Sequence, residues 1–419
     1  MKILLKKVLI ADANSPFDNT SKDILIDDGK IISIKDKITE KADTTIEEEL
    51  TVSPGWIDSF SHFCDPGYEF KETIETGAAA AIAGGFTHVF VLPNTLPVVQ
   101  SKSQVEYIVQ KSKSLGITIH PLGTVTKNIE GKDLAEMYDM HASGAIAFSD
   151  GLNPVQIPGL FLKALQYVKA FDGILIQMPI DKTIGTHGLI NEGIISTQLG
   201  LPGIPAIAEE IMIKRDIELV RYTNSKLHLT GISTEKSIEL IKAAKAEGLQ
   251  ISCSVTPYHL FFCDEDLLDY DTNLKVNPPL RSKADMLALR KAVMAGTIDC
   301  IASHHMPQNW DNKTCEFEYA KYGMIGLETS FAVVNHVLPE LTDRQLINLF
   351  STNARNIFKI ASATIEEGAN AELTLFNRNK TSLLTKENIK SKSNNTPFIN
   401  KELKGKVVGI INKGQLFLN

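Results

Sequence analysis

The chain has 419 residues, of which 43% are hydrophobic and 22% charged, so it carries enough apolar side chains for a large buried core. Its formal net charge is -7, and acidic and basic residues are mixed along the chain. This distribution forms no basic track and argues against a nucleic-acid partner. No apolar run is long enough to cross a bilayer, so we expect no membrane span.

The N-terminus and the cysteines indicate the compartment. The segment MKILLKKVLIADAN carries lysines within its apolar stretch and has no small-residue cleavage site, so it predicts a strand rather than a signal peptide. The five cysteines are odd in number and scattered, without a CxxC pair: Cys64, Cys253, Cys263, Cys300 and Cys315. This pattern predicts reduced thiols in a cytoplasmic protein.

Eight short apolar runs end in small or polar residues and predict strands. They are TVSPGWIDSFSH, FTHVFVLPN, ITIHPLG, GAIAFSD, GILIQMP, KLHLTGIS, QISCSVTP and DCIASHHMP. Amphipathic segments with apolar residues three and four apart lie between them, including KETIETGAAAAIAGG, IAEEIMIKRDIELVRYTNS and EKSIELIKAAKAEG. Strands that alternate with helices imply a parallel sheet, and eight such units predict a closed (β/α)8 TIM barrel over residues 53–362. An open doubly wound sheet is the alternative, but no GxGxxG follows the first strand.

The two ends of the chain differ from its middle. Residues 1–52 and 363–419 predict short strands with turn pairs such as Asp28-Gly29 and Lys413-Gly414. We therefore expect a small β-sandwich domain built from both termini. The polar segment TKENIKSKSNN, at residues 385–395, predicts a mobile loop.

Active sites of such barrels form at the C-terminal ends of the strands, so chemistry is sought there. Those ends include DSFSH at residues 58–62, PNT at 93–95, DG at 150–151, QMP at 177–179, TG at 230–231 and SHH at 303–305. These segments, together with VNPPLR, NEGIISTQLGLPGIPAIAEE, YGMIGLETSF and NTPF, resemble dihydroorotases over nearly the whole chain.

The resemblance implies a cyclic-amide hydrolase in which one or two zinc ions activate a water. Family members supply the metal ligands from a His-x-His pair after the first strand, a carboxylate or carboxylated lysine after the fourth, a His after each of the fifth and sixth, and an Asp after the eighth. That Asp is also the general base, and an Arg beyond the His pair grips the substrate carboxylate.

Carried over residue by residue, most of these positions are changed. His62 remains from the pair, and Asp150 is the residual carboxylate. The other ligand positions are occupied by Phe60, Met178, Gly231 and His304, of which His304 stands at the general-base position. Cys64 replaces the substrate arginine, and Gln308 replaces a later substrate-contacting His. The family's substrate-pocket positions persist as Asn94, Asn277, Tyr322 and Gly323.

Phe and Gly side chains cannot ligate zinc, and a Met thioether is poorly matched to a hydrolytic zinc. A catalytic zinc usually has three protein ligands and a water, so two surviving ligands predict no catalytic residue and no bound cofactor. Alternatives remain open. His304 and His305 could rebuild a metal site with His62, Asp150 and Cys64, and Cys64 could act as a nucleophile, although no orienting carboxylate is apparent. His62 could equally be a packed barrel histidine.

Three functions are compatible with this sequence. The first is a non-catalytic dihydroorotase-like protein of pyrimidine synthesis, which the resemblance implies could support aspartate transcarbamoylase as a structural or regulatory partner. The second is an active zinc-dependent dihydroorotase, or a related cyclic-amide hydrolase, with an altered site. The third is a sensor that binds a dihydroorotate-like acid, against which the loss of the arginine at Cys64 argues. Homodimerisation is expected from the family.

Overall fold

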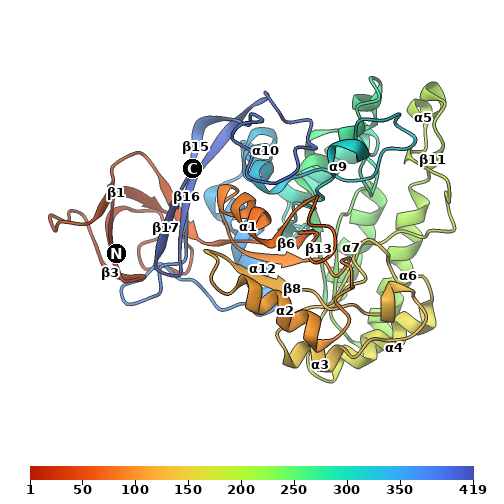
Figure 1. The fold of residues 1–419 in the computed structure, drawn as a ribbon, viewed down its shortest axis with the longest axis horizontal. Coiled ribbons are helices and arrows are strands. Elements are labelled where there is room, and N and C mark those ends of the chain that lie inside the picture. Colours follow the sequence, from red (N-terminus) through yellow and green to blue (C-terminus); the bar gives the residue numbers. More distant parts are fainter.

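Eight parallel segments close into the predicted barrel. The structure, a computed structural model, describes all 419 residues (Figure 1). The barrel strands are β6 (Trp56–Ser61), β7 (Phe86–Val91), β8 (Thr118–Pro121), β9 (Leu175–Gln177), β12 (Leu227–Leu229), β13 (Ile251–Val255) and β14 (Cys300–Ile301). The fourth predicted strand is reduced to Phe148, which bridges Gly123 and Leu175, and a bridge between Ser61 and His305 closes the ring.

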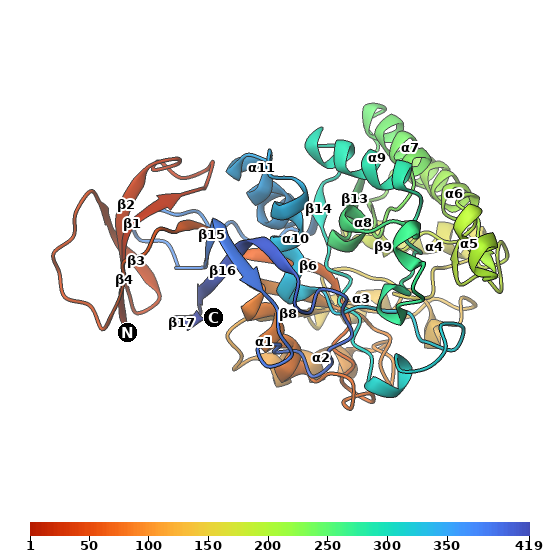
Figure 2. The ribbon, with the colours of Figure 1, turned by 90° about the horizontal axis from the view of Figure 1, so that it is seen from above.

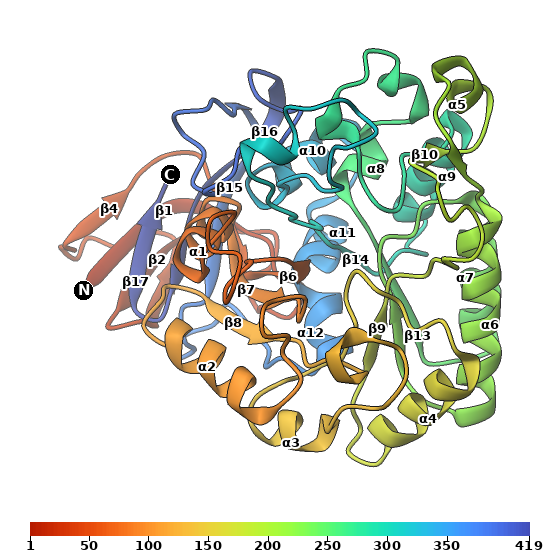
Figure 3. The same ribbon diagram turned by 45° about the vertical axis from the view of Figure 1, so that its right-hand side comes forward.

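Helices follow the strands and surround them (Figure 3). The α-helices are α1 (Ile74–Ala83), α2 (Lys102–Ser112), α3 (Met137–Ala142), α4 (Pro158–Lys169), α5 (Ile194–Leu199), α6 (Ile207–Thr223), α7 (Glu235–Ala246), α8 (Pro257–Phe261), α9 (Lys283–Met294), α10 (Ser330–Val337), α11 (Asp343–Ile347) and α12 (Asn353–Phe358). Single turns lie at η1 (Lys127–Ile129), η2 (Asp264–Leu267), η3 (Thr272–Leu274), η4 (Trp310–Asn312), η5 (Leu327–Thr329) and η6 (Asn348–Thr352). None of the helices is both long and apolar enough to cross a membrane.

Local sequence explains where helices begin. The Thr73 side chain accepts from the Thr76 N–H at the start of α1, and Thr234 and Ser282 cap α7 and α9 in the same way. Each cap satisfies a backbone N–H that has no partner inside the helix. These caps fix the residues at which α1, α7 and α9 begin.

Strands from both termini form one sheet, in the order β17-β16-β15-β5-β1-β2-β3, with β4 paired to β1 (Figure 2). Their bounds are β1 (Lys2–Ile10), β2 (Ser21–Asp27), β3 (Lys30–Lys35), β4 (Thr44–Ile46), β5 (Thr51–Pro54), β15 (Leu373–Leu383), β16 (Glu402–Asn412) and β17 (Gln415–Leu418). A short pair, β10 (Ile190–Asn191) and β11 (Gly203–Ile204), lies before α6. The turn pairs Asp28-Gly29 and Lys413-Gly414 connect β2 to β3 and β16 to β17, with positive φ at all four residues.

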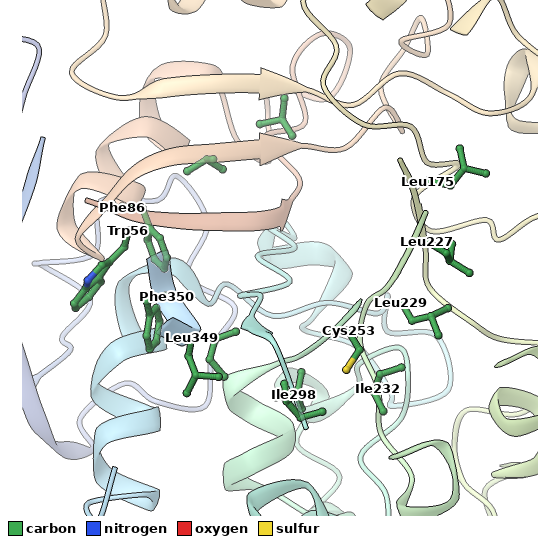
Figure 4. Packing of buried hydrophobic residues seen from close by; sticks show 14 of the residues in the cluster. Trp56, Phe86, Leu175, Leu227, Leu229, Ile232, Cys253, Ile298, Leu349 and Phe350 are labelled. Atoms are coloured by element: carbon green, nitrogen blue, oxygen red, sulfur yellow. The ribbon is translucent and has the colours of Figure 1, made fainter. Parts of the chain in front are cut away.

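The predicted first strand, TVSPGWIDSFSH, is divided between the two parts of the molecule. β5 belongs to the terminal sheet, and β6 begins the barrel after Gly55. Trp56 is fully buried here beside Phe350, and the two ring centroids are 5.0 Å apart (Figure 4). The Phe376 ring centroid lies 5.3 Å from that of Trp56. Since Phe376 lies on β15, this aromatic cluster fastens the terminal sheet to the bottom of the barrel.

The segment at residues 385–395 differs from its prediction as a mobile loop. Ser391, Ser393 and Asn395 are buried, and the Glu328 carboxylate accepts the N–H groups of Lys390 and Ser391, each at 3.1 Å. The Ser391, Ser393 and Asn395 side chains also donate hydrogen bonds to barrel residues, so residues 390–395 are held against the barrel. Composition alone did not reveal these partners, which lie far away in the sequence.

Candidate functional site

The barrel mouth contains a cavity of about 390 Å³. The four predicted substrate-pocket residues, Asn94, Asn277, Tyr322 and Gly323, line this one cavity. His62, Cys64 and Gln308 line it as well. The other predicted ligand positions, Phe60, Asp150, Met178, Gly231 and His304, do not line it. The structure thus brings the pocket positions together in one cavity, and most of the predicted ligand positions lie outside its lining.

Phe60 and Met178 belong to the apolar barrel interior. Both side chains are completely buried, in a cluster that also contains Phe90, Leu122 and Ile176. Apolar packing of this kind contributes about 1.5–3 kcal/mol for each large side chain buried. The side chains at these two predicted ligand positions therefore stabilise the fold and supply no nitrogen or oxygen donor.

His304 packs against Phe60 and is held in place by a hydrogen bond. The two ring centroids are 4.4 Å apart, and His304 Nε2 lies 2.8 Å from Thr230 Oγ1. Burial lowers the pKa of His304 to about 3. The imidazole is consequently neutral near pH 7 and a weak base.

Gly231 leaves the space that His304 fills. Its φ is +71°, and a Cβ at this position would lie 2.8 Å from His304 Cε1 and 3.2 Å from Pro278 Cδ. A side chain at residue 231 would therefore collide with the imidazole and adopt a strained backbone conformation. The residues at positions 60, 231 and 304 therefore fit one another.

Both ring nitrogens of His62 are already occupied. The Cys64 N–H donates to His62 Nδ1 at 2.9 Å, so Nε2 carries the proton and donates to the Asn94 carbonyl at 3.0 Å. Burial lowers the pKa of His62 to about 4. Since a metal needs a free nitrogen lone pair, this geometry fits a hydrogen-bonded barrel histidine.

The Asp150 carboxylate is turned toward the loop after β8. It accepts the N–H groups of Val125 and Thr126, each at 2.9 Å, and the Thr126 hydroxyl. Burial raises the pKa of Asp150 to about 6, although these hydrogen bonds oppose the shift. The carboxyl therefore orders a loop.

The donor set does not fit a hydrolytic zinc. No three His, Cys, Asp or Glu side chains are grouped so that they could hold one metal ion. His305, the other half of the adjacent pair, accepts from the Gly326 N–H through Nδ1 and bonds Glu72 through Nε2 at 3.2 Å. Burial raises the pKa of the Cys64 thiol, which opposes formation of a nucleophilic thiolate.

Sequence reasoning missed Glu72 and its partners. Burial alone would raise the pKa of this carboxylate, but hydrogen bonds from His305, Ser391 and Thr76 hold the pKa below its usual value. It also accepts the Lys392 N–H at 3.0 Å. Glu72 thus ties the eighth strand end to residues 391–392, and no local pattern near Glu72 indicated that link.

Solved structures place the fold in a class. The L-hydantoinase (dihydropyrimidinase) of Arthrobacter aurescens matches with a TM-score of 0.87 at 21% identity, over 100% of this chain and 96% of that chain. A D-hydantoinase structure matches with a TM-score of 0.84 at 19% identity, over 100% and 95%. The fold is therefore a TIM barrel with a small β-domain formed from both termini, as predicted.

Sequence comparison identifies the family. A family model described as dihydro-orotase-like matches residues 50–237. The dihydroorotase of Syntrophus aciditrophicus is 38% identical over 99% of both chains, and that of Caldanaerobacter subterraneus is 40% identical over 99% of this chain and 97% of its own. This chain belongs to the dihydroorotase family, which confirms the resemblance inferred from its motifs.

Proposed function

We propose that this chain is a non-catalytic member of the dihydroorotase family that acts in pyrimidine synthesis as a structural or regulatory protein. The observation that carries the proposal is the mutual packing of His304, Phe60 and Gly231. Side chains that fit one another fill the ligand positions, and a zinc-binding histidine cannot be added at one of them without moving another.

The remaining polar groups supply no replacement for the metal-activated water. His304 is neutral and bonded to Thr230, while Asp150 and Glu72 are bonded to backbone or hydroxyl donors. A general base must reach the attacking water within hydrogen-bond distance. None of these three groups lines the cavity at the barrel mouth, so hydrolysis of a cyclic amide there lacks both its Lewis acid and its base.

Dihydroorotate turnover tests this function. The full chain, supplied with zinc, is assayed beside an active dihydroorotase, and we expect no rate above the uncatalysed background. A rate that scales with the concentration of this chain and is abolished by a chelator would contradict the proposal.

The family resemblance supports aspartate transcarbamoylase as the partner, and self-association as a homodimer. Co-purification and transcarbamoylase activity with and without this chain measure the first, and sedimentation measures the second. If transcarbamoylase activity and assembly are unchanged at every ratio of the two proteins, the partnership is rejected.

A second candidate is an active dihydroorotase with an altered site. The observation that favours it is the set of relatives named dihydroorotase, which are 38–40% identical over almost the full chain. The same turnover assay separates the two candidates, because only the second predicts a zinc-dependent rate.

A further inference from the structure

Two buried lysines fasten the loop at residues 308–322 to the segment that contains η3. Lys275 and Lys313 are only 2% and 9% exposed. The Lys275 ammonium donates to the Phe317 carbonyl of the loop at 2.7 Å. In the other direction, the ammonium of Lys313, which lies on the loop, donates to the Thr272 carbonyl of η3 at 2.8 Å. Each segment thus inserts one lysine into the other.

Neither ammonium is paired with a carboxylate. Their hydrogen-bond acceptors are all backbone carbonyls. Lys275 also faces two aromatic rings, with its Nζ 5.3 Å from the Phe317 centroid and 5.2 Å from the Tyr322 centroid. Carbonyls and ring faces compensate a buried charge only in part, so the charged form of each lysine destabilises this arrangement.

The surroundings of the two lysines favour their neutral forms. Burial lowers the pKa of Lys313 from 10.5 to about 7 and that of Lys275 to about 8. The Lys275 ammonium lowers the pKa of Lys313 further. The other charged or titratable groups that face the pair are the Lys321 ammonium, which acts in the same direction as burial, and three groups that oppose it, namely Asp271, Cys315 and Glu318.

The loop contains a further buried group without a partner. Asn309 Oδ1 accepts no hydrogen bond, and an unpaired buried acceptor destabilises the conformation that buries it. The two ends of the loop, at Gln308 and Tyr322, line the cavity of the barrel mouth. The closed position of the loop is therefore weakly held, and a movement of the loop changes access to the cavity.

We propose that residues 308–322 form a lid at the edge of the barrel mouth, which is held closed when Lys275 and Lys313 are neutral and is released when both are charged. Closing the lid releases protons, because the lysines of an open lid are in water and keep their usual pKa. The ratio of closed to open lid should therefore rise with pH, by up to about tenfold per pH unit for each lysine, from about pH 7 for Lys313 and about pH 8 for Lys275 up to 10.5. The lid does not depend on the proposed function, because none of its groups stands at a predicted ligand position.

Hydrogen exchange of the full chain, followed by mass spectrometry, tests the lid. Two backbone bonds of the closed loop report on it: the Lys321 N–H donates to the Asn312 carbonyl, and the Gly323 N–H donates to the Lys275 carbonyl, each at 3.0 Å. Protection is the exchange rate of an unprotected amide divided by the observed rate at the same pH, which removes the pH dependence of exchange itself. We expect protection over residues 308–323 to rise at least about tenfold between about pH 7 and pH 9, whereas protection of α7 should stay constant.

Methionine substitutions identify the groups that cause the rise. The double variant Lys275→Met, Lys313→Met keeps the apolar stems and removes both ammonium groups, so protection of the loop should no longer depend on pH. The matched control, Lys242→Met, removes an exposed lysine of α7 and should keep the wild-type rise. Circular dichroism and the protection of α7 establish that the double variant is folded.

Three results would overturn the lid. They are loop protection that stays constant with pH in the wild type, an equal rise in the double variant, and an equal rise in α7, which would indicate a change of the whole chain. Dihydroorotate turnover does not enter this measurement. Rejection of the lid therefore leaves the non-catalytic function standing, and turnover by this chain would reject that function and leave the lid standing.

Discussion

Adding a methyl group at Gly231 tests whether His304 occupies the space of a lost ligand. In Gly231→Ala, the new Cβ would lie 2.8 Å from His304 Cε1, and the imidazole cannot move without losing its bond to Thr230 and its contact with Phe60. Overpacking of this kind costs about 1–3 kcal/mol, and a non-glycine residue at positive φ costs about 1–2 kcal/mol more. We therefore expect a destabilisation of about 2–5 kcal/mol.

The same substitution in a His304→Ala background should cost the backbone part, about 1–2 kcal/mol, together with the smaller effect of the contact with Pro278 Cδ at 3.2 Å. The coupling between the two positions, about 1–3 kcal/mol, is obtained from urea midpoints of the four chains in a double-mutant cycle. Gly248→Ala is the matched control, because Gly248 has φ +82° and a Cβ added there would meet nothing within 4 Å. Additive effects of Gly231→Ala and His304→Ala would refute the argument that one residue fills the other's space.

Three further predictions concern the same barrel mouth. Burial lowers the pKa of His304 from 6.5 to about 3, so its contribution to stability is present above pH 6.5 and is lost as the pH falls toward 3, by up to about 1.4 kcal/mol per pH unit. Urea midpoints of His304→Gln should therefore decline less between pH 6.5 and 5 than those of the wild type. Parallel declines of the two chains would count against this prediction. Glu72→Gln should destabilise the chain by about 2–3 kcal/mol and accelerate tryptic cleavage at Lys390 and Lys392. Glu75→Gln, at an exposed position, should do neither. Unchanged cleavage in Glu72→Gln would contradict the inference that Glu72 holds residues 391–392 in place. Restoration of the family's residues combines Phe60→His, Cys64→Arg, Met178→His, Gly231→His and His304→Asp. The full set should create zinc binding measurable by metal analysis, and the set that lacks His304→Asp should not. Zinc binding by that incomplete set would be a contrary result.

The barrel could be predicted from sequence because its signals are local. Each strand ends in small or polar residues, and the helices between strands have apolar residues at three- and four-residue spacing. The fourth strand is the exception, since only Phe148 bridges its neighbours. The segment GAIAFSD carries the same pattern as the others, and its short pairing depends on tertiary geometry.

The positions of the candidate site could be predicted, but their interactions could not. Strand-end motifs located His62, Asn94 and His304, because parallel strands present their C-terminal ends at one face. The direction in which each side chain points depends on distant partners: His62 bonds Asn94, and Asp150 bonds the loop at Thr126. Lys71, which also lines the cavity, could not be predicted from a strand-end motif, because it lies near the end of the loop before α1, ten residues after the end of β6.

The zinc content of the purified full chain tests the central claim most directly. After equilibration with zinc and removal of free metal, mass spectrometry of the digested sample should find far less than one zinc ion per chain, since the donor set provides no group of three ligands. One or two zinc ions per chain, retained at the barrel mouth and lost when Asp150 or His62 is replaced by alanine, would contradict this account.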